Sequence, residues 1–367
     1  MRVLHVMWRM SIGGAERAVY QLVREQRRRG TEADVAVAGE LGIYGERLRE
    51  AGALVHELGC RHALDLRGSR RLTRLAREYD IVHHHGIEPL LLAASMRARS
   101  PRLVYTHRGG IREHGWRKRL RLRVAKPYVR QFPALSGNTR QSARVLARFL
   151  GIPDRDVAVV YNGLDFALLA PDREPEDVRL DLPAWPHGSF LVGTAANLQP
   201  LKRVHLLLEA VGLLDEPLVH CLVLGDGPER ASLEELADKL GLRDRVSFLG
   251  RIDHVGDYLQ LLDAFVLPSG PEEAFGNAAV EAMGVGIPTV VFADGGGLVE
   301  HVRDRETGHI VRGTDELVAV LRELAANPGS RLRLGEAGRQ YAQITYSLDA
   351  MFERYEALYL RAMAVSR

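Results

Sequence analysis

The sequence predicts a chain of two doubly wound α/β domains, each with a parallel sheet flanked by helices. Short apolar runs alternate with helical patterns from the N-terminus, the alternation pauses in a stretch rich in Pro, Asp and Glu at residues 171–186, and a second alternation follows. The length of 367 residues agrees with about two domains of ordinary size. Because no repeat of fixed short period occurs, solenoid and propeller folds are disfavoured.

The first alternation starts at the N-terminus. Residues 3–7 form an apolar run, the pair Gly13-Gly14 follows, and apolar residues then recur at helical spacing from residue 15 to residue 23. Gly30 marks the end of that helix, and further strands are predicted at residues 33–38, 81–83 and 103–106. Strands that alternate with helices at this spacing predict parallel βαβ units with right-handed crossovers.

The second alternation supplies the other sheet. It follows Asn162-Gly163 and the acidic, proline-rich connection. Two helices close the chain, the last at residues 348–364. The predicted strands cover residues 190–195, 219–224, 246–249, 264–267, 289–292 and 309–311.

Composition and cysteine content favour a globular protein of a reducing compartment. Hydrophobic residues make up 46% of the chain and charged residues 26%, which excludes a disordered or fibrous protein. Cys60 and Cys221 lie too far apart in sequence for a disulfide framework or a Cys-rich zinc site. No apolar run approaches the roughly 18 residues of a membrane span, and Arg9 interrupts the apolar start too early for a signal peptide. We expect a cytoplasmic protein, with peripheral attachment to the inner face of the cell membrane as the alternative.

Charge is divided unevenly between the two halves. The net charge of the chain is +3. Residues 1–170 contain 31 Lys and Arg and 16 Asp and Glu, a net charge of +15. The remaining residues contain 19 Lys and Arg and 31 Asp and Glu, a net charge of −12. Two domains with different partners are therefore predicted.

Two carboxylates frame a helix start in the second domain. Glu273 precedes a helix that is expected to begin near Gly276, and Glu281 follows inside it, so the two carboxylates are roughly 12 Å apart along the axis. The unpaired N–H groups between them form an anion site at the positive end of the helix dipole. A nucleotide diphosphate sugar has hydroxyls at both ends and phosphate in the middle, as this layout requires. The alternative interpretation is a helix with an ordinary acidic first turn.

Two further turns carry features of phosphate sites. Gly13-Gly14 opens a helix at the carboxyl end of a strand, although it is equally an ordinary tight turn. Lys202 and Arg203 follow the loop after the first strand of the second domain, where cations would neutralise a diphosphate or simply be solvated. The chain contains neither a dinucleotide fingerprint nor a P-loop motif.

The histidines give weaker signals. In the run His83-His84-His85, strand alternation puts His83 and His85 on one face and His84 on the other, so these three side chains are not expected to converge on a metal. His107 ends a predicted strand where catalytic groups collect in this architecture, with a plain strand-end histidine as the alternative.

A basic segment stands out in the first domain. Residues 102–148 contain 13 Lys and Arg against one acid. The segment is typical of helices on anionic membranes and is equally open to acceptor docking or to simple solvation. Nucleic acid is disfavoured as a partner because no nucleic-acid motif accompanies it. The proposed docking residues are Trp116, Arg117, Lys118, Arg119 and Arg121.

Taken in order, these motifs resemble a known family. Glu273 and Glu281 match the Glu-x7-Glu signature of the retaining glycosyltransferases of family 4, which the whole chain resembles. Other matching stretches are Gly13-Gly14-Ala15-Glu16-Arg17, Asp80-Ile81-Val82-His83, Thr106-His107, Asn162-Gly163-Leu164-Asp165, Gly225-Asp226-Gly227-Pro228 and Val246-Ser247-Phe248-Leu249-Gly250.

The resemblance implies the GT-B fold, in which two Rossmann-like domains face a central cleft. It implies an acceptor domain at residues 1–168, joined by a C-terminal helix at about residues 347–367 that crosses back to it, and a donor domain at residues 169–346. The donor would be a nucleotide diphosphate sugar, with a UDP-sugar favoured and a GDP-sugar as the alternative. The acceptor hydroxyl would belong to a lipid-linked glycan or a small molecule.

Residue roles also follow from the resemblance. Glu273, Lys202 and His107 would be catalytic: Glu273 holds the donor sugar's hydroxyls, Lys202 stabilises the departing diphosphate together with the backbone of Gly14, and His107 touches the sugar. Glu281 would accept hydrogen bonds from the ribose. The implied donor-binding set is Gly13, Gly14, Asn197, Lys202, Arg203, Arg251, Ile252, Ala274, Phe275, Gly276, Asn277, Ala278 and Glu281.

The implied reaction retains the anomeric configuration, with the leaving phosphate oxygen acting as base. No metal or other cofactor is required if Lys202 and the helix amides carry the charge. One departure concerns Asn197, which stands where the family often has an arginine facing the diphosphate, and Arg203 and Arg17 are candidates to compensate. The alternatives are a weakly active or non-catalytic homologue and a UDP-sugar epimerase of the same fold.

Overall fold

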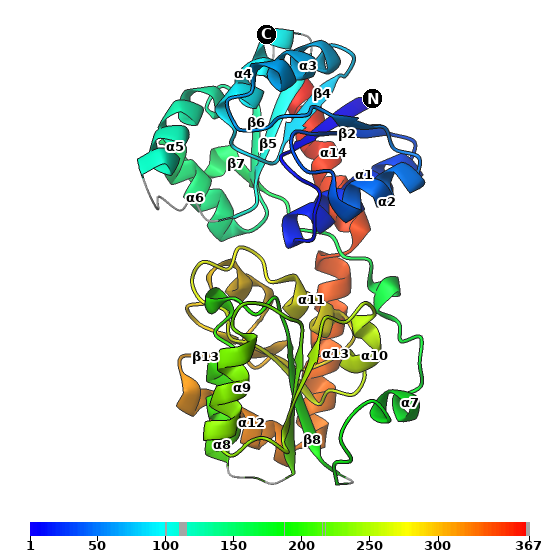
Figure 1. Ribbon diagram of the computed structural model, residues 1–367, viewed down its shortest axis with the longest axis vertical. Coiled ribbons are helices and arrows are strands. Elements are labelled where there is room, and N and C mark those ends of the chain that lie inside the picture. The colour runs from blue at the N-terminus through cyan, green and yellow to red at the C-terminus, as the bar shows by residue number, and fades with distance from the viewer. Residues whose placement is uncertain (100, 110–115, 187, 215, 217, 365–367) are drawn as a thin grey trace. The chain divides into compact units, whose positions relative to one another are not determined.

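The computed structural model describes all residues except 100, 110–115, 187, 215, 217 and 365–367 (Figure 1). The chain forms two compact units, residues 1–164 with the segment from residue 348 onward, and Asp165–Ser347. The predicted division after residue 168 falls four residues into the second unit. There the short helix η2 (Phe166–Leu169) packs on the second unit, since Phe166 covers Gly284 and the Leu169 carbonyl covers Gly256.

The first unit contains a seven-stranded parallel sheet in the order β3-β2-β1-β4-β5-β6-β7. The order changes direction at β1 and β4, which is the doubly wound arrangement the alternation predicts. The strands are β1 (Arg2–Met7), β2 (Glu32–Val37), β3 (Val55–Glu57), β4 (Ile81–His84), β5 (Arg102–His107), β6 (Ala134–Gly137) and β7 (Val157–Val159). The helices are α1 (Gly14–Arg28), α2 (Gly42–Glu50), α3 (Leu66–Ala76), α4 (Pro89–Ala98), α5 (Trp116–Val129) and α6 (Arg140–Leu150), with a short η1 (Asp154–Asp156).

The second unit contains a six-stranded parallel sheet in the order β10-β9-β8-β11-β12-β13. Its predicted strands are confirmed to within one residue at each end. They are β8 (Phe190–Ala195), β9 (Val219–Leu224), β10 (Val246–Gly250), β11 (Ala264–Leu267), β12 (Thr289–Phe292) and β13 (Gly308–Val311). The helices are α7 (Pro175–Arg179), η3 (Pro200–Lys202), α8 (His205–Leu214), α9 (Arg230–Lys239), α10 (Val255–Leu259), α11 (Asn277–Gly284), η4 (Gly296–His301), α12 (Thr314–Ala326) and α13 (Pro328–Thr345).

The last helix, α14 (Leu348–Ala364), belongs to the first unit although it follows the second in sequence. It covers one face of the first sheet beside α1 (Figure 1). Its buried side chains pack against β1, β4 and β5 through contacts with Val3, Ile81 and Val104. The predicted bounds of this helix are confirmed. The α14 residues in this cluster are Met351, Tyr355, Leu358, Tyr359 and Ala362.

Candidate functional site

The predicted donor-binding residues of the second unit follow the ends of parallel strands, so they gather at one edge of its sheet. Asn197 and Lys202 follow β8, Arg251 and Ile252 follow β10, and Glu273 follows β11. The carboxyl edge of a parallel sheet beside a reversal of strand order is where ligands of open α/β folds bind. The reversal lies between β8 and β11, the strands that Lys202 and Glu273 follow in sequence.

Lys202 and Glu273 form an ion pair at this edge. The Lys202 ammonium donates to Glu273 Oε2 at 2.5 Å, and the two side chains are 19% and 11% exposed. Burial raises the pKa of Glu273, but the charge of Lys202, its hydrogen bond and the backbone N–H of Phe275 outweigh burial and lower that pKa. Glu273 is therefore ionised at neutral pH, and each member of the pair neutralises the other.

Helix α11 begins where the sequence predicts. Gly276 precedes it with φ of 77°, a left-handed conformation in which a Cβ would also lie 2.6 Å from Leu298 Cδ1. Among the described residues, no side-chain cap forms at Gly276, and the Ala279 N–H donates to the Gly276 carbonyl at 3.0 Å within the first turn. Glu281 lies inside the helix and is 5% exposed.

A histidine that the sequence did not reveal fixes the loop between Glu273 and the helix. His301 Nε2 donates to the carbonyl of Phe275 at 2.7 Å, and the Tyr346 hydroxyl donates to His301 Nδ1 at 2.8 Å. Burial lowers the pKa of His301 to about 4, so the ring is neutral at pH 7. His301 and Tyr346 are far from the Glu-x7-Glu segment in sequence, and nothing in their local pattern marks them.

A glycine loop after β12 supports the backbone of Glu273. Gly297 N–H donates to the Glu273 carbonyl at 2.8 Å. Gly296 has φ of 66°, and a Cβ there would lie 2.5 Å from the same carbonyl oxygen. This close approach explains why glycine occupies the position.

Asn197 lies in a loop joined to the turn after β9. Leu198 N–H donates to the carbonyl of Asp226 at 3.0 Å, and Glu229 N–H donates to the carbonyl of Leu198 at 2.9 Å. A Cβ at Gly227 would lie 2.7 Å from Asn197 Oδ1. Asn197 and Arg251 are exposed at this edge, and Ile252 is partly exposed.

Arg203 differs from the sequence-based expectation. Its Nε donates to the carbonyl of Pro268 at 2.8 Å, and its terminal nitrogens bond the carbonyl of Ser269 at 2.9 Å and the carboxylate of Asp294 at 2.9 and 2.7 Å. The guanidinium therefore bridges the ends of two neighbouring strands, and a diphosphate would have to displace these bonds to reach it.

In the first unit, Gly13, Gly14 and His107 lie at the carboxyl edge of the other sheet. Gly13 precedes α1 in extended conformation, and a Cβ at position 13 would collide with the Glu16 carboxylate. His107 is 7% exposed, and its Nε2 is buried without a hydrogen-bond partner among the described residues. Burial lowers the pKa of His107 to about 4, so it is a neutral ring at pH 7.

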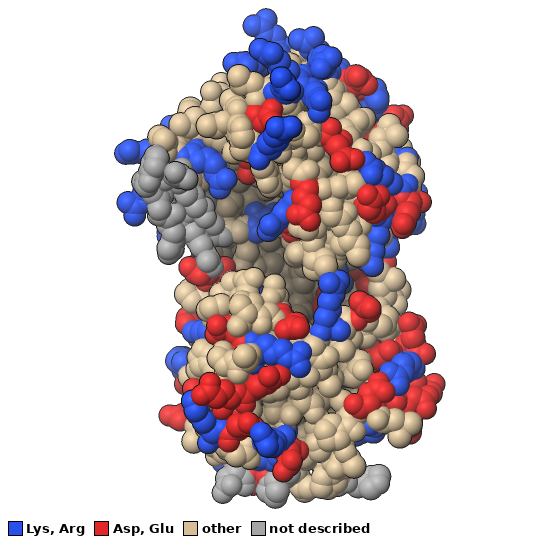
Figure 2. Space-filling model, in the orientation of Figure 1, with Lys and Arg blue, Asp and Glu red and all other residues tan. Residues whose placement is uncertain are grey.

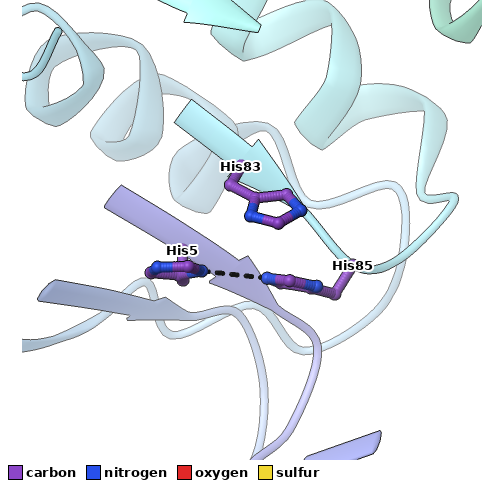
Figure 3. Close-up of side chains that lie close together, drawn as sticks. All are labelled: His5, His83 and His85. Carbon is purple, nitrogen blue, oxygen red and sulfur yellow. Dashed lines mark hydrogen bonds between the residues drawn. The ribbon is translucent and has the colours of Figure 1, made fainter. Parts of the chain in front are cut away.

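A three-histidine cluster forms in the first unit, but with His5 in place of His84. His83 and His85 lie on one face, as strand alternation predicts, while His84 contacts Ser95 at 2.8 Å on the other. His5 joins them from the neighbouring strand because it pairs in register with His83 (Figure 3). One ligand atom from each lies within 4.8 Å of the others. Sequence reasoning missed His5, which strand pairing alone brings into the group.

Hydrogen bonds already occupy the ring nitrogens of this cluster. Arg108 Nε donates to His85 Nδ1 at 3.1 Å, so His85 Nε2 carries the proton and donates to His5 Nδ1 at 3.0 Å. His5 Nε2 then donates to the side-chain carbonyl of Gln26 at 2.8 Å. His83 accepts from the Tyr359 hydroxyl at 2.9 Å and donates to Thr106 at 2.7 Å. A metal ion would have to displace these bonds beside the Arg108 cation, so the site does not suit one.

Of the predicted docking residues, the structure describes the side chains of Arg119 and Arg121, whereas Trp116, Arg117 and Lys118 lie outside the described side chains. Arg119 is exposed, and Arg121 approaches Glu88 at 3.9 Å. The outer part of the first unit shows mainly Lys and Arg, whereas the second unit shows Asp and Glu interspersed with them (Figure 2). Within the described residues, no helix combines the length and apolarity needed to cross a membrane.

Comparisons with known proteins define the fold and the family. Residues 182–341 match the family model described as Glycosyl transferases group 1, and residues 12–168 match Glycosyltransferase Family 4. The crystal structure of Anabaena Alr3699/HepE in complex with UDP aligns with a TM-score of 0.85 at 24% identity, covering 97% of this chain and 99% of that one. Sucrose-phosphate synthase from Thermosynechococcus elongatus aligns with a TM-score of 0.78 at 22% identity over the full length of both chains. The fold is that of the two-domain GT-B proteins.

Curated relatives agree with the family matches. The lipopolysaccharide core biosynthesis glycosyltransferase LpsD of Rhizobium meliloti (strain 1021) is 32% identical over 211 residues, 57% of this chain and 59% of the relative. The D-inositol 3-phosphate glycosyltransferase of Thermomonospora curvata is 34% identical over 248 residues, 62% of this chain and 57% of the relative. The alignments span less than two thirds of these relatives. The chain belongs to the glycosyltransferase family 4 group, as its two family matches together span most of its length.

Proposed function

We propose that this protein is a retaining glycosyltransferase that moves a sugar from a nucleotide diphosphate sugar to an acceptor hydroxyl. The observation that carries the proposal is the pairing of Lys202 with Glu273 beside the uncapped N-terminus of α11. A cation, a carboxylate and the positive end of a helix dipole at one sheet edge provide what a diphosphate and a sugar hydroxyl require.

In this proposal the donor occupies the carboxyl edge of the second sheet. The diphosphate replaces Glu273 as the ionic partner of the Lys202 ammonium. The Glu273 carboxylate can then accept hydrogen bonds from sugar hydroxyls. Ala274, Asn277 and Ala278 contribute backbone contacts beside Phe275 and Gly276. Glu281 binds the ribose, and Arg251 and Ile252 border the base.

The first unit completes the reaction in this proposal. Gly14 offers backbone N–H to the diphosphate, and closure brings His107 against the sugar and excludes water. The leaving phosphate oxygen takes the proton of the acceptor on the same face, which gives retention. The neutral state of His107 at pH 7 suits a hydrogen-bonding role toward the sugar rather than a charged one.

Lys202 and the helix amides would carry the developing charge without a metal ion. UDP is the favoured nucleotide, because the HepE structures contain UDP and UDP-glucose. The names of the relatives point to lipopolysaccharide cores, inositol phosphate and malate as acceptor types, so a polyol or a lipid-linked glycan is the preferred acceptor class.

Nucleotide release tests this proposal. The purified protein is incubated with UDP-glucose, UDP-galactose and UDP-N-acetylglucosamine, with and without EDTA, in the presence of candidate acceptors. We expect acceptor-dependent UDP release with one donor, unchanged by EDTA. Tight UDP binding without release from any donor would instead favour a non-catalytic homologue, for which Asn197 is the supporting observation. Interconversion of UDP-sugars without transfer would favour the epimerase alternative.

The basic helix α5 is proposed to dock the protein to an anionic membrane surface. Its support is that Leu120 and Val124, which lie four residues apart on one helix face, are exposed, as is Arg119. Sedimentation with vesicles of phosphatidylglycerol and of phosphatidylcholine tests this, with the triple variant Arg117→Gln, Lys118→Gln, Arg119→Gln as comparison. We expect a preference for the anionic vesicles that the variant loses. Equal sedimentation with both vesicles would contradict docking and favour a soluble acceptor.

A further inference from the structure

The side chain of Arg203 ties three loops of the second unit together. Its four hydrogen bonds end on Pro268 and Ser269 after β11 and on Asp294 after β12, while Arg203 itself follows β8. Its guanidinium also lies 5.3 Å from the centre of the Phe292 ring, within cation–π distance. The Arg203 side chain is 23% exposed and that of Asp294 is 56% exposed.

The backbone at Arg203 is in a conformation that this residue adopts only when held there. Its φ of 48° and ψ of 38° lie in the left-handed region, which is unfavourable for a residue with a Cβ. Such a conformation persists where the surrounding structure fixes it, and it clusters at functional sites. Here the guanidinium contacts act together with two backbone hydrogen bonds, from the Arg203 N–H to the Pro200 carbonyl at 3.2 Å and from the Leu206 N–H to the Arg203 carbonyl at 3.0 Å. The residue directly before Arg203 is Lys202.

The tied loops are also the ones that carry Glu273. Gly270 N–H donates to the carbonyl of Leu201 at 2.8 Å, and Glu273 N–H donates to the carbonyl of Gly270 at 3.0 Å. Gly297 N–H, in the loop that follows Asp294, donates to the Glu273 carbonyl at 2.8 Å. The loops that Arg203 contacts are therefore both hydrogen-bonded to the backbone of Glu273, the partner of Lys202.

We propose that Arg203 and Asp294 form a positioning pair that holds the Lys202 ammonium where the donor's diphosphate binds, without touching the donor. This inference rests on the proposed function, and it replaces the expectation that Arg203 contacts the diphosphate. Asp294 lies outside every motif recognised in the sequence. Loss of either partner frees the turn at Lys202, so affinity is lost only for ligands whose diphosphate Lys202 contacts.

Matched nucleotides separate positioning from general stability. The affinities of UDP and UMP are measured by calorimetry for the wild type and for Arg203→Ala, Arg203→Lys, Asp294→Asn and Lys202→Ala. The control is Arg243→Ala, which breaks a bidentate pair with Asp238 in the same unit, where the two side chains are 79% and 50% exposed. We expect Arg203→Ala to lower the ratio of UDP to UMP affinity about tenfold, a change that costs about 1.4 kcal/mol in UDP binding. Asp294→Asn should lower it about threefold, and Arg203→Lys should recover part of the loss.

The decisive measurement uses the double variant Lys202→Ala, Arg203→Ala. If Arg203 acts through Lys202, the second substitution adds no further loss to the ratio. Equal losses of UDP and UMP affinity, or an undiminished effect of Arg203→Ala in the Lys202→Ala background, would overturn the proposal. Asp294→Asn preserves the side-chain shape and carries the test if Arg203→Ala does not fold. Failure of the wild type to bind UDP, GDP, ADP and dTDP would overturn the proposed function, whereas an unchanged ratio in a binding protein overturns only the positioning pair.

Discussion

At the scale of single residues, the Lys202–Glu273 pair explains how a largely buried carboxylate stays ionised. A carboxylate that is 11% exposed beside a helix N-terminus needs a partner, and Lys202 supplies it at 2.5 Å. In the proposed function, the diphosphate replaces Glu273 as the partner of the ammonium. Donor binding would then be an exchange of ionic partners, after which the Glu273 carboxylate could accept hydrogen bonds from sugar hydroxyls.

This exchange predicts different defects for the two carboxylates. Glu281→Ala should weaken UDP binding at least tenfold, because a buried hydrogen-bonding carboxylate is lost from the proposed ribose site. Glu273→Ala should leave UDP binding within about threefold and lower turnover at least a hundredfold, the scale of losing one electrostatic group in a transition state. Calorimetry with UDP and the rate of donor-dependent nucleotide release measure the two effects.

The neighbouring exposed Glu272 provides the matched control, since Glu272→Ala changes the same charge one residue away. It should behave like the wild type in both measurements. Wild-type binding and turnover in both Glu273→Ala and Glu281→Ala would show that the site is elsewhere.

Candidate site residues that stand in a continuous sequence motif could be predicted. Residues that the fold brings to the site from distant segments could not. Glu273, Glu281 and Lys202 stand in local patterns, namely a carboxylate pair around a helix start and a cation after a strand. Asp294 after β12 bonds Arg203, His301 in η4 bonds the Phe275 carbonyl, and no spacing in the sequence connects either residue to its partner. The sequence identifies Arg203 as a candidate cation. The orientation of its side chain depends on backbone carbonyl groups whose positions are known only in the folded chain.

At the scale of elements, α14 is bound to the first sheet by polar contacts as well as packing. The Tyr359 hydroxyl donates to His83 Nδ1 at 2.9 Å and accepts from Gln26 Nε2 at 3.3 Å. The Tyr355 hydroxyl accepts from Arg108 at 2.8 Å. A helix from the end of the chain thereby completes the core of the first unit.

Removal of one hydroxyl tests this attachment. Tyr359→Phe leaves the buried Nδ1 of His83 without its donor, so we expect a loss of about 1–3 kcal/mol in the free energy of unfolding. Urea denaturation measures it. Tyr258→Phe is the control, because its hydroxyl bonds Asp181 at an exposed position and should cost less than about 0.5 kcal/mol. Equal effects of the two substitutions would contradict a structural role for the Tyr359 contact.

The elements that the sequence did not predict are short. β3 and β7 have three residues each, and β6 has the sequence ALSG, which lacks a β-branched residue. These strands depend on pairing with neighbours rather than on their own composition. Longer apolar runs such as those of β8 and β9 were predicted with their bounds because all or nearly all of their residues are buried.

At the scale of the whole molecule, buried neutral histidines make stability depend on pH. Burial lowers the pKa of His5, His107 and His301 to about 4, and that of His84 to about 3. In the unfolded chain these groups titrate near 6.5, so between that value and 4 the unfolded state binds more protons than the folded state. Stability is therefore complete above the unfolded pKa and is lost as the pH falls.

The free energy of unfolding should fall between pH 7.5 and pH 5.0, with each such histidine contributing about 2 kcal/mol. Urea denaturation at the two pH values measures the change. Replacement of His84, whose Nε2 bonds only the Ser95 hydroxyl among the described contacts, should reduce the pH dependence. Equal or greater stability at pH 5.0 would contradict burial of these rings in the neutral form.

The most direct test of the central claim is thermal stability in the presence of nucleoside diphosphates. UDP, GDP, ADP and dTDP are each added with and without Mg²⁺ to the wild type and to Glu281→Ala. A ligand at about 100 times its dissociation constant stabilises the folded state by about 2.7 kcal/mol, which is readily measured as a rise in Tm. We predict selective stabilisation by one nucleotide, with UDP favoured, independent of Mg²⁺ and lost in Glu281→Ala. Stabilisation by none of the four, or equal stabilisation of the variant, would contradict a nucleotide-sugar site at the carboxyl edge of the second sheet.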